Sequence, residues 1–596
     1  MNILLCAIFI PITASLLCFI FRGIAKWVAL LISAVALVLA LLVFFGGGVA
    51  SSLMNLRAYV FSSGIFLASA VITLLITLYS FKFMEGKDRL GEYYGYILMT
   101  LGAAAGALFA ADYIMLLVFW GVLGITLYML VGMGGPEASS AAKKTFIIVG
   151  GADALMILGI GLIWAITGSP VIGAVRLPLS NIYIVMAFLC LAGGAFAKAG
   201  AIPFHTWIPD SAECAPTPVM AYLPAALDKL LGIYLLTRIC VDIFTLQPNS
   251  PISVFLLIIG SVTIIAAVMG ALVQHNLKKL LSFHAVSQVG YMILGIGTGI
   301  PIAVAGGVFH MLNNAIYKSL LFLGGGAIEN QTGTTELDRL GGLARFMPVT
   351  FISVLVAALS ISGVPPFNGF FSKWMIYQGL IELRMTSPYW IIWLVAAMFG
   401  SALTLASFMK IIHAAFLGQW SESTARAKEV PATMWVPMVL LAALCLIFGV
   451  FAYVLPLGFF ILPSIKNVVY FGFFSPTMAT FLIIIGLFIG VLIYWLGKVK
   501  QAAVSRPAYI GGELLDEEMV KVSGVNFYDT IREWGPLKGL YRISEKKAFD
   551  IYEIGTKVTF GLSGVLRWLH NGLLHTYLAW MLLGLIILLS ILMRRI

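Results

Sequence analysis

The chain has 596 residues, of which 61% are hydrophobic and only 10% are charged. Soluble domains carry about 25% charged residues, so this composition excludes an ordinary soluble protein and indicates a membrane protein. The net charge of +11 does not indicate a nucleic-acid partner, because the basic residues are dispersed among the loops between apolar runs. The six cysteines are scattered without a CxxC pair, and no GxGxxG or P-loop pattern occurs, so the sequence predicts neither an iron–sulfur cluster nor a nucleotide site.

Apolar runs of about 20 residues, long enough to cross a hydrocarbon core of about 30 Å, recur along almost the whole chain. The first run lacks the basic start and the small-residue cleavage site of a signal peptide, so we interpret it as a span. We therefore predict an all-α polytopic membrane protein with about 16 transmembrane helices. The predicted spans are 2–21, 25–45, 60–81, 93–110, 112–132, 144–167, 182–201, 216–238, 251–272, 279–299, 301–325, 348–380, 389–415, 434–455, 477–496 and 573–593.

Basic residues are distributed unequally between the two sets of loops. Loops after odd-numbered spans, up to the thirteenth, carry Arg22, Lys26, Lys82, Lys87, Arg89, Lys143, Lys144, Lys278, Lys279, Arg339, Arg345, Arg426 and Lys428. Loops after even-numbered spans carry Arg57, Arg176, Arg384 and Lys466, with Arg238 at an edge. The positive-inside rule then places the odd loops on the cytoplasmic side of the membrane and both ends of the chain outside. The membrane that we predict is the cell (inner) membrane of a prokaryote.

Two predicted spans, the seventh and the twelfth, are interrupted at similar sequences. AKAGAIPFHTWIPD (197–210) and SGVPPFNGFFSKW (362–374) align at AGAIPF and SGVPPF, with Lys198 before the first break and Lys373 after the second. A proline removes a backbone donor and frees an upstream carbonyl, so a span breaks where it lines a polar cavity. Paired breaks of this kind indicate inverted internal repeats, as in transporters. The alternative for each lysine is a side chain that snorkels to the membrane surface. The prolines at the predicted helix breaks are Pro203, Pro365 and Pro366.

More polar residues lie in the spans between the two breaks. His310, Asn314 and Lys318 follow one another at intervals of four residues and therefore share one helix face. His284 and Gln288 form a shorter ladder on the tenth span. A single residue of this kind is more often a contact between helices, but so many in consecutive spans favour a connected ion path.

The carboxylates within the spans are few. Asp228 and Lys229 are adjacent on the eighth span and point about 100° apart, so they do not simply neutralise each other. Asp153 lies in the sixth span without an adjacent base, and His205 follows the first break. Sodium prefers clustered carboxylates, whereas a lysine beside a movable carboxylate, or a histidine with a reference pKa near 6.5, exchanges protons. The pattern therefore favours H⁺ as the ion.

A charged segment lies between about residue 500 and residue 572. Apolar residues recur there at steps of three and four, and charged residues fall largely between them. This pattern predicts an amphipathic helix along the cytoplasmic surface of the membrane, bent at Gly535-Pro536. The alternative is a soluble linker. The apolar positions are Ile531, Trp534, Leu537, Tyr541, Phe549 and Tyr552.

Four segments, FHTWIPDSAECAPTPV, KKLLSFHAVSQVGYM, FHMLNNAIYKSLLFLGGG and SGVPPFNGFFSKW, resemble signature segments of a known family. The family comprises the antiporter-like subunits of respiratory complex I and the Mrp-type cation/proton antiporters, and the resemblance covers roughly residues 60–420. AYLPAALDKLLGIYLL and the tail from YIGGE onward look most like the large membrane subunit of energy-converting NiFe hydrogenases of the Ech type. The predicted domains are the N-terminal spans (1–92), the first antiporter-like repeat (93–238), the second antiporter-like repeat (251–415), the C-terminal spans (416–500), the amphipathic lateral helix (501–572) and the last transmembrane helix (573–596).

The resemblance implies roles for residues at matching positions. Lys198 matches the central proton-carrying lysine of the first half-channel, and Lys373 matches the group that exchanges protons with the far side. His310 matches a relay histidine, and the lateral helix matches one that braces neighbouring subunits. An acid of the family's sixth span is matched by Asp153, and a lysine of its eighth span by Lys229. A lysine on the helix of the relay histidine is matched by Lys318. The candidate proton-translocation residues are Lys198, Asp153, Asp228, Lys229, His284, His310, Lys318, Lys373 and His205.

The sequence departs from the family's pattern at two positions. The family pairs its first lysine with a glutamate in a Trp-Glu dipeptide, but this chain reads Trp120-Gly121, and the usual eighth-span histidine falls at Pro224. Either Asp153, our first choice, or Asp228 takes the place of the glutamate, or pumping is weakened or lost.

The sequence therefore predicts a proton-translocating subunit of a membrane-bound, ion-pumping oxidoreductase complex, either an energy-converting hydrogenase or a complex I-like assembly. This subunit holds no cofactor or redox centre of its own, and Fe–S clusters, with NiFe in the case of a hydrogenase, lie in partner subunits. One alternative is an Mrp-type Na⁺/H⁺ antiporter subunit. Another is a non-conducting membrane anchor, which Gly121 favours. A redox enzyme with its own quinone or metal site is disfavoured by the scattered cysteines.

Overall fold

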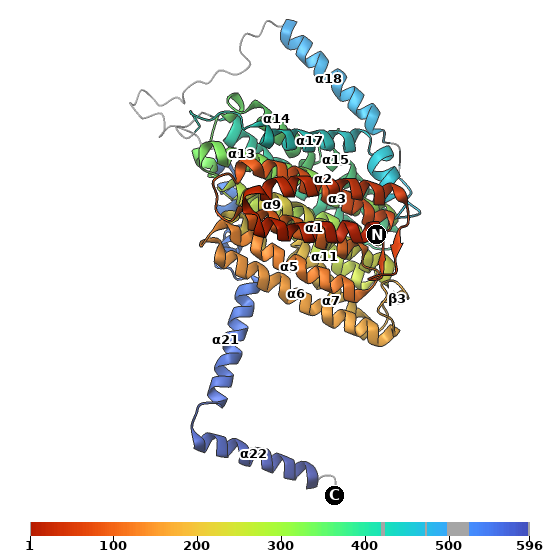
Figure 1. Ribbon diagram of the computed structural model, residues 1–596, viewed down its shortest axis with the longest axis vertical. Coiled ribbons are helices and arrows are strands. Elements are labelled where there is room, and N and C mark those ends of the chain that lie inside the picture. The colour runs from red at the N-terminus through yellow and green to blue at the C-terminus, as the bar shows by residue number, and fades with distance from the viewer. Residues whose placement is uncertain (1, 419–423, 471, 473, 497–523, 594–596) are drawn as a thin grey trace, which may run out of the picture. The chain divides into compact units, whose positions relative to one another are not determined.

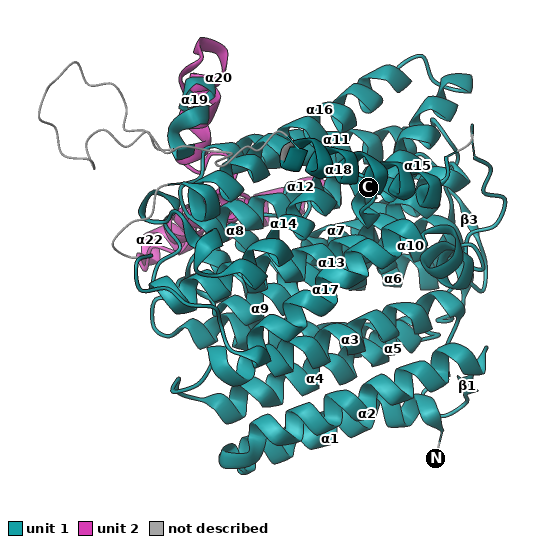
Figure 2. Cartoon of the chain, turned by 90° about the horizontal axis from the view of Figure 1, so that it is seen from above, with its two compact units in different colours: residues 1–532 teal, residues 533–596 magenta. Residues whose placement is uncertain are grey.

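Helices dominate the computed structural model, which describes residues 2–418, 424–470, 472, 474–496 and 524–593 (Figure 1). Two compact units comprise residues 1–532 and 533–596 (Figure 2). Most helices of the larger unit run roughly parallel in one bundle (Figure 1). A bundle satisfies every backbone hydrogen bond within its own segments, as a bilayer requires.

The first part of the bundle contains seven helices that precede the first break. These are α1 (Ile3–Ile20), α2 (Ala25–Gly46), α3 (Val60–Phe83), α4 (Leu90–Phe109), α5 (Tyr113–Val131), α6 (Ala138–Thr167) and α7 (Ile182–Ala199). Short polar side chains begin several of them, because they accept hydrogen bonds from backbone N–H groups that have no partner within the helix. Asn2, Asp112 and Asn181 do this at the starts of α1, α5 and α7.

The remaining helices follow the same alternation of apolar run and short loop. The central ones are α8 (Trp207–Cys214), α9 (Thr217–Tyr222), α10 (Asp228–Arg238), α11 (Pro251–Leu272), α12 (Leu277–Gly297) and α13 (Pro301–Thr332). The later ones are α14 (Pro348–Ser362), α15 (Asn368–Glu382), α16 (Trp390–Ile411), α17 (Ala432–Val450), α18 (Pro476–Leu496), α19 (Asp529–Glu533), α20 (Gly535–Glu545), α21 (Ile551–Leu569) and α22 (Leu574–Met593).

Thirteen helices of the described chain are long and apolar enough to cross a membrane. The three other predicted spans correspond to α4, to the long polar-bearing α13, and to the pair α14 and α15, which are separated by the second break. The chain is thus an all-α multi-pass protein, as the sequence predicts. It has no closed sheet among the described residues, only two pairs of two-residue strands.

The two strand pairs lie in loops. β1 (Ala50–Ser51) and β2 (Leu56–Arg57) form an antiparallel hairpin after α2, and β3 (Leu177–Pro178) pairs in parallel with β4 (Phe244–Thr245). The second pair joins the loop after α6 to the loop after α10, which are far apart in sequence. Both pairs therefore fix the positions of loops at the ends of helices.

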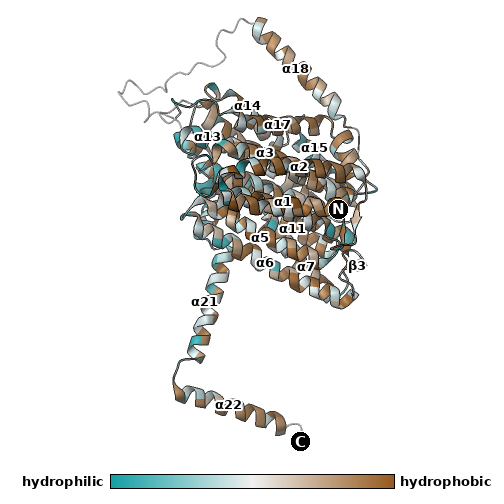
Figure 3. Cartoon of the chain, in the orientation of Figure 1, coloured by the Kyte–Doolittle hydropathy of each residue, from teal (hydrophilic) through white to brown (hydrophobic). Residues whose placement is uncertain are grey.

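Burial within the bundle is the reverse of that in a soluble protein. The most apolar 18-residue window within Thr217–Ile243 is entirely buried and that within α12 is 94% buried, although these helices carry many of the polar residues. By contrast, only 28% of the most apolar window within 22–46 is buried. Hydrophobic residues cover most helices, and hydrophilic ones gather at helix ends and loops (Figure 3). Apolar side chains therefore face outward, where lipid is the solvent, and polar side chains face the interior.

The predicted lateral helix is segmented where the structure describes it. Its first part, residues 501–523, lies outside the described residues. The predicted bend at Gly535-Pro536 coincides with the gap between α19 and α20, and a second gap, containing Lys547 in a left-handed conformation, separates α20 from α21. The predicted last span, 573–593, corresponds to α22.

Candidate functional site

The first break ends α7 one residue after Lys198. Gly200 follows with φ of +79°, a left-handed conformation that suits glycine at the end of a helix. The Trp207 indole of α8 donates a hydrogen bond to the Ala197 carbonyl at 3.1 Å, and thereby satisfies one of the acceptors left by the break. His205 lies in the short segment between the two helices and is half-buried. The helix therefore ends inside the bundle, and the Ala197 carbonyl near its end still has a hydrogen-bond donor.

Ion pairs hold α8 beside its neighbours. Asp210 on α8 accepts a hydrogen bond from Lys144 on α6 at 2.7 Å, and Glu213 accepts one from Lys279 on α12 at 2.7 Å. Because these bonds come from two different helices, α8 is tied to both sides of the break.

Lys198 forms a buried ion pair across the break. Its ammonium lies 3.7 Å from the Asp228 carboxylate and 5.5 Å from the centre of the Trp120 ring, and its side chain is 0% exposed. Within the described chain, neither the Lys198 ammonium nor the Asp228 oxygens have a hydrogen-bond partner. Since an ammonium offers three donors and a carboxylate accepts at both oxygens, the pair keeps hydrogen-bonding capacity for an exchanging proton.

A π-turn places Asp228 at the start of α10. The turn, Leu223–Leu227, contains Pro224, which has no backbone N–H. Side chains of α13 satisfy carbonyls of this segment: Asn314 donates to the Ala225 carbonyl at 3.0 Å, and Ser319 donates to the Ala221 carbonyl at 2.8 Å. The eighth span is therefore interrupted too, and its polar partners come from the helix with the His310 ladder.

Lys229, the residue after Asp228, also lies close to the first break. A Cβ atom built at Gly200 would overlap the Ile208 side chain and lie 3.3 Å from the Lys229 ammonium, so the missing side chain of this glycine leaves room for both. Lys229 is 0% exposed, and its ammonium has no hydrogen-bond partner among the described residues. Both Asp228 and Lys229 therefore reach the region around the first break, although they point in different directions.

The position of the family's glutamate is open in this chain. A Cβ atom at Gly121 on α5 would meet nothing within 4 Å, and one at Gly124, a turn further along, would lie 3.6 Å from the Asp153 carboxylate. Asp153 on α6 interacts electrostatically with Lys198. The sequence favours Asp153 as the counter-charge, but the ion pair is with Asp228. Asp153 instead supplies a second carboxylate along the same face of α5.

The middle of the site joins α12, α13 and α16. Lys318 donates a hydrogen bond to the Leu281 carbonyl at 2.9 Å and lies 5.6 Å from the centre of the Phe408 ring. His284 Nε2 lies 2.7 Å from the Ser407 hydroxyl. Lys318 interacts electrostatically with both Lys229 and His284, so it connects the first break to the histidines.

His310 has a partner at each ring nitrogen. Nδ1 lies 2.9 Å from the Ser372 hydroxyl, and Nε2 lies 3.1 Å from Gln288 Oε1 and 3.2 Å from the Tyr317 hydroxyl. Because an amide oxygen only accepts, Nε2 carries the proton and Nδ1 accepts from Ser372 when the ring is neutral. The ring is thus oriented by hydrogen bonds from α12, α13 and α15.

The second break repeats the first with the lysine on its other side. Gly363, with φ of +81°, ends α14, and Lys373 on α15 reaches back to donate to the Ile361 carbonyl at 2.8 Å. When AGAIPF and SGVPPF are aligned, Ile361 occupies the position of Lys198. Lys373 is 2% exposed and lies 4.7 Å from the centre of the Tyr291 ring. The lysines of the site are all at most 2% exposed, so none of them snorkels to the surface of this chain. They are Lys198, Lys229, Lys318 and Lys373.

The structure brings together eight of the nine candidate residues. Successive electrostatic interactions join Asp153 to Lys198, Lys198 to Asp228, Asp228 to Lys229, Lys229 to Lys318, Lys318 to His284, His284 to Lys373, and Lys373 to His310. His205 lies beside this row, within the first break. A series of titratable side chains, each within electrostatic range of the next, therefore runs from one break to the other.

Sequence reasoning missed a further buried lysine. Lys410 on α16 is 4% exposed and donates hydrogen bonds of 2.8 Å to the Leu272 and Gln274 carbonyls. A lysine within an apolar run was the signal that could have identified it. Ser372 and Ser407, which bind the two histidines, carry no such signal, because serine is common in membrane helices.

The described residues contain no group of three or more His, Cys, Asp or Glu side chains that could hold a metal ion. The described cysteines are all free thiols. The titratable groups of the site are ammonium, carboxylate and imidazole groups, which exchange protons.

Comparison of the sequence with known proteins gives consistent matches. Residues 110–404 match the family described as NADH:quinone oxidoreductase/Mrp antiporter, TM. A Na(+)/H(+) antiporter subunit of Bacillus subtilis (strain 168) is 29% identical over 547 residues, which cover 87% of this chain and 64% of that protein. A Na(+)/H(+) antiporter subunit of Staphylococcus epidermidis is 30% identical over 466 residues, which cover 72% of this chain and 58% of that protein. The chain thus spans less than two thirds of the length of these relatives.

Solved structures share the fold. A chain of the membrane-bound sulfane sulfur reductase (MBS), an archaeal respiratory membrane complex, matches with a TM-score of 0.84 and 25% identity, over 99% of this chain and 100% of that chain. A chain of the Mrp complex from Dietzia sp. DQ12-45-1b has a TM-score of 0.69 and 22% identity, over 76% of this chain and 95% of that chain. A chain of respiratory complex I from Thermus thermophilus has a TM-score of 0.66 and 22% identity, over 76% of this chain and 97% of that chain. The chain is therefore a multi-pass protein of bacterial or archaeal membranes that belongs to the NADH:quinone oxidoreductase/Mrp antiporter membrane family.

Proposed function

We propose that this chain is the proton-translocating subunit of a membrane-bound oxidoreductase complex, in which electron transfer in partner subunits drives protons through the buried series of titratable residues. The observation that carries the proposal is the buried Lys198–Asp228 ion pair at the first break, from which further buried titratable side chains, each within electrostatic range of the next, lead to the second break. Charged groups in a membrane interior are costly, and a connected set of them is expected only where ions move.

The ion pair at the first break is the proposed switch. While the Asp228 carboxylate faces Lys198, it stabilises the charged ammonium. When a partner subunit displaces or neutralises that carboxylate, Lys198 releases its proton. Lys229 and Lys318 are like charges within interaction range, so protonation of one disfavours protonation of the other. A proton that arrives at Lys229 therefore favours release of a proton from Lys318, which lies nearer the histidines and the second break.

The second half of the path is the proposed outlet. His284 interacts with both Lys318 and Lys373, and Lys373 interacts with His310. A histidine with hydrogen bonds at both nitrogens, as His310 has, accepts a proton at one nitrogen and releases one from the other. The hydroxyl and amide groups around it hold the ring in position for this transfer.

The full-length match supports a complex driven by electron transfer. The chain and its counterpart in the archaeal respiratory complex cover each other almost completely, whereas it spans only 64% of the B. subtilis antiporter protein. The antiporter relatives favour a second candidate function, Na⁺/H⁺ exchange. An anchor without conduction is less well supported, because Asp228 supplies the carboxylate that Gly121 lacks. The finer resemblance to Ech-type hydrogenases stays a prediction, and redox centres are proposed only for partner subunits.

The test is proton movement by the intact complex in sealed vesicles. With electron donor and acceptor present, the wild-type complex should acidify one side without added sodium, and a protonophore should abolish the gradient. Lys198→Ala should abolish the gradient while electron transfer persists or slows. Lys143→Ala, which removes an exposed lysine of α6, is the matched control and should pump normally.

Undiminished pumping by Lys198→Ala would show that this lysine carries no protons. Strict dependence on Na⁺, with Na⁺ uptake that resists the protonophore, would favour the antiporter function instead.

We also propose that residues 93–238 and 251–415 are the two repeats, that the N-terminus lies outside, and that residues 501–572 form a lateral connection to neighbouring subunits. The separation of apolar and charged residues along α20 and α21 supports the last point. Deletion of residues 526–566 should disperse the complex while the remaining spans still insert into the membrane. Recovery of an intact, active complex after the deletion would contradict this role.

A further inference from the structure

A cavity of about 540 Å³ lies outside the series of titratable residues, at the far end of α10 from Asp228. The loops after α2, α6, α10 and α17 all contribute to its wall. Each of these loops follows an even-numbered predicted span, so the four loops belong on one face of the membrane. Its size falls within the range of about 300–1,000 Å³ that is typical of small-molecule sites.

The two small strand pairs build the rim of the cavity. Arg57 ends β2, whose register with β1 fixes it opposite Ala50. Arg176 precedes β3, and Asp242 lies shortly before β4, so the parallel pairing of these strands brings Arg176 to the end of α10. The backbone N–H of Ile172 donates to the Ala111 carbonyl at 2.9 Å and so ties the loop after α6, which also carries Arg176, to the segment after α4. The side chains are therefore presented by a fixed frame.

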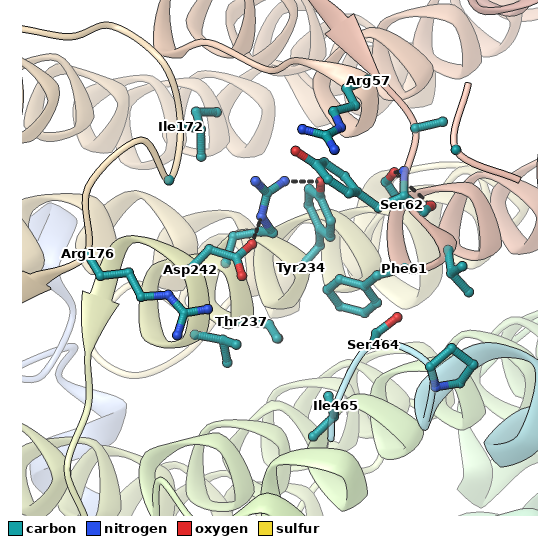
Figure 4. Close-up of a pocket in the computed structure, with 18 residues that line it drawn as sticks. Arg57, Phe61, Ser62, Ile172, Arg176, Tyr234, Thr237, Asp242, Ser464 and Ile465 are labelled. Carbon is teal, nitrogen blue, oxygen red and sulfur yellow. Dashed lines mark hydrogen bonds and ion pairs between the residues drawn. The ribbon is translucent and has the colours of Figure 1, made fainter. Parts of the chain in front are cut away.

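Three arginines and one carboxylate line the cavity (Figure 4). Arg238 is nearly buried, forms an ion pair with Asp242 and donates a hydrogen bond to the Tyr234 hydroxyl at 2.8 Å. Arg57 and Arg176 come from different loops, with Tyr234 and Asp242 between them (Figure 4). The single carboxylate is engaged by Arg238, so two guanidinium charges are left without an acidic partner in the lining.

Two of the guanidinium groups share one aromatic ring. The Arg57 guanidinium lies 4.9 Å and that of Arg238 lies 5.3 Å from the centre of the Tyr59 ring. Cation–π contacts favour each charge separately, but bringing two like charges to one ring has an electrostatic cost. An anion in the cavity would offset that cost.

The gathering of positive charge is unusual for this face of the protein. The loops after even-numbered predicted spans carry few basic residues, namely Arg57, Arg176, Arg384, Lys466 and, at an edge, Arg238. Three of the five meet in this one cavity. Topology favours basic residues on the opposite face, so their convergence here calls for a local function.

We propose that this cavity binds a phosphate-type anion, either the headgroup phosphate of an anionic lipid or free phosphate. Arginine's planar fork of N–H donors matches phosphate oxygens. Arg57 and Arg176 present two such forks from separate loops, and the charge of Arg238 at the end of α10 adds to the positive potential of the cavity. Phe61, Ile172 and Ile465 give the cavity an apolar wall beside the arginines, which suits the glycerol end of a lipid headgroup. The inference is independent of proton translocation, because no residue of the proposed proton path lines the cavity.

The test uses the full chain, purified in its complex, with two probes. The first probe is spin-labelled phosphatidylglycerol in phosphatidylcholine nanodiscs, for which the immobilised fraction is measured. The second is radiolabelled inorganic phosphate in detergent, measured by equilibrium dialysis. Arg57→Gln/Arg176→Gln should weaken binding of at least one probe by about tenfold or more, since each charge-assisted bond contributes about that factor.

The matched control is Arg384→Gln/Lys466→Gln, which removes two exposed positive charges from the same set of loops outside the cavity. It should bind both probes as the wild type does. Weakened lipid binding alone assigns the site to a headgroup, and weakened phosphate binding alone assigns it to a free anion. The proposal is wrong if neither probe binds the wild type, if the arginine variant binds both normally, or if the control loses as much. Arg176→Gln alone, at an exposed residue, repeats the test should the double variant unfold.

Discussion

The two helix breaks place an ammonium group at equivalent points but surround it differently. At the first break Lys198 comes from the helix before the gap and faces the Asp228 carboxylate. At the second break Lys373 comes from the helix after the gap and meets the Ile361 carbonyl and the Tyr291 ring. No carboxylate among the described residues forms an ion pair with Lys373.

The comparison separates what the two breaks share from what differs between them. At each break one helix ends at a glycine in the left-handed conformation, and a buried lysine lies at the gap, from the helix before it or from the helix after it. The counter-charge is not shared, because α10 supplies a carboxylate at the first break, whereas a backbone carbonyl and an aromatic ring take its place at the second. The first break therefore holds a charge pair, whereas the second holds a single cation.

The largest effect is expected from breaking the charge pair. Asp228→Asn leaves Lys198 buried without its partner, and removal of one member of a buried pair destabilises proteins by about 3–5 kcal/mol. The free energy of unfolding, measured by denaturant titration in detergent, should fall by that amount, and pumping should stop.

Removing both charges tests the explanation. Lys198→Met in the Asp228→Asn background should recover most of the lost stability without restoring pumping. If the double variant stays as unstable as Asp228→Asn alone, the carboxylate has a structural role that the ion pair does not explain.

A smaller effect is expected at the second break. Lys373→Met removes one hydrogen bond to a carbonyl and one contact with the Tyr291 ring, a loss of about 1–3 kcal/mol. Pumping should again be abolished, so function should suffer equally while stability suffers less. The same denaturant titration provides the comparison. If Lys373→Met lowers the free energy of unfolding as much as Asp228→Asn does, the two breaks do not differ in how strongly their lysine contacts stabilise the protein.

The smallest effect is expected where the family's acid is absent. Gly121→Glu adds a side chain where a Cβ atom would meet no protein atom within 4 Å, and the family holds a glutamate at this position. No packing is lost, so the free energy of unfolding should fall less than in the variants above, and pumping should persist. Gly124→Glu is the control, because its side chain would begin 3.6 Å from the carboxylate of Asp153 and bring a like charge beside it. Equal tolerance of both substitutions would show that Asp153 does not lie against this face of α5.

The sequence predicted most of the fold because the signals are local. Apolar length marks the spans, and the Gly-Pro segments mark both breaks, which the structure places directly after Ala199 and Ser362. The π-turn at Leu223–Leu227 was not predicted beyond the presence of Pro224, since its carbonyls are satisfied by side chains of α13, far away in sequence.

The site was predicted as a set of residues but not as a set of contacts. Lys198, Lys229, Lys318 and Lys373 were identified because a lysine in an apolar run needs an explanation. The partner of Lys198 was ranked incorrectly: the sequence favoured Asp153 over Asp228, although each lies one span away from Lys198. Only the packing of α7 against α10 brings Asp228 to the ammonium. Pairing across helices depends on which faces meet, and a single sequence does not contain that information.

The helix α13 contacts the segments that carry both proposed halves, 93–238 and 251–415. It has 32 residues and is about 48 Å long at about 1.5 Å per residue. Asn314 holds the Ala225 carbonyl of the first half, and Asn313 holds the Asn368 carbonyl of the second at 2.9 Å. Because α13 contacts both halves, a shift of this helix that follows a change in the first half alters contacts in the second, and by reciprocity any coupling acts equally in both directions. We therefore expect a substitution in α13 that loosens one of these two contacts to be felt in both halves.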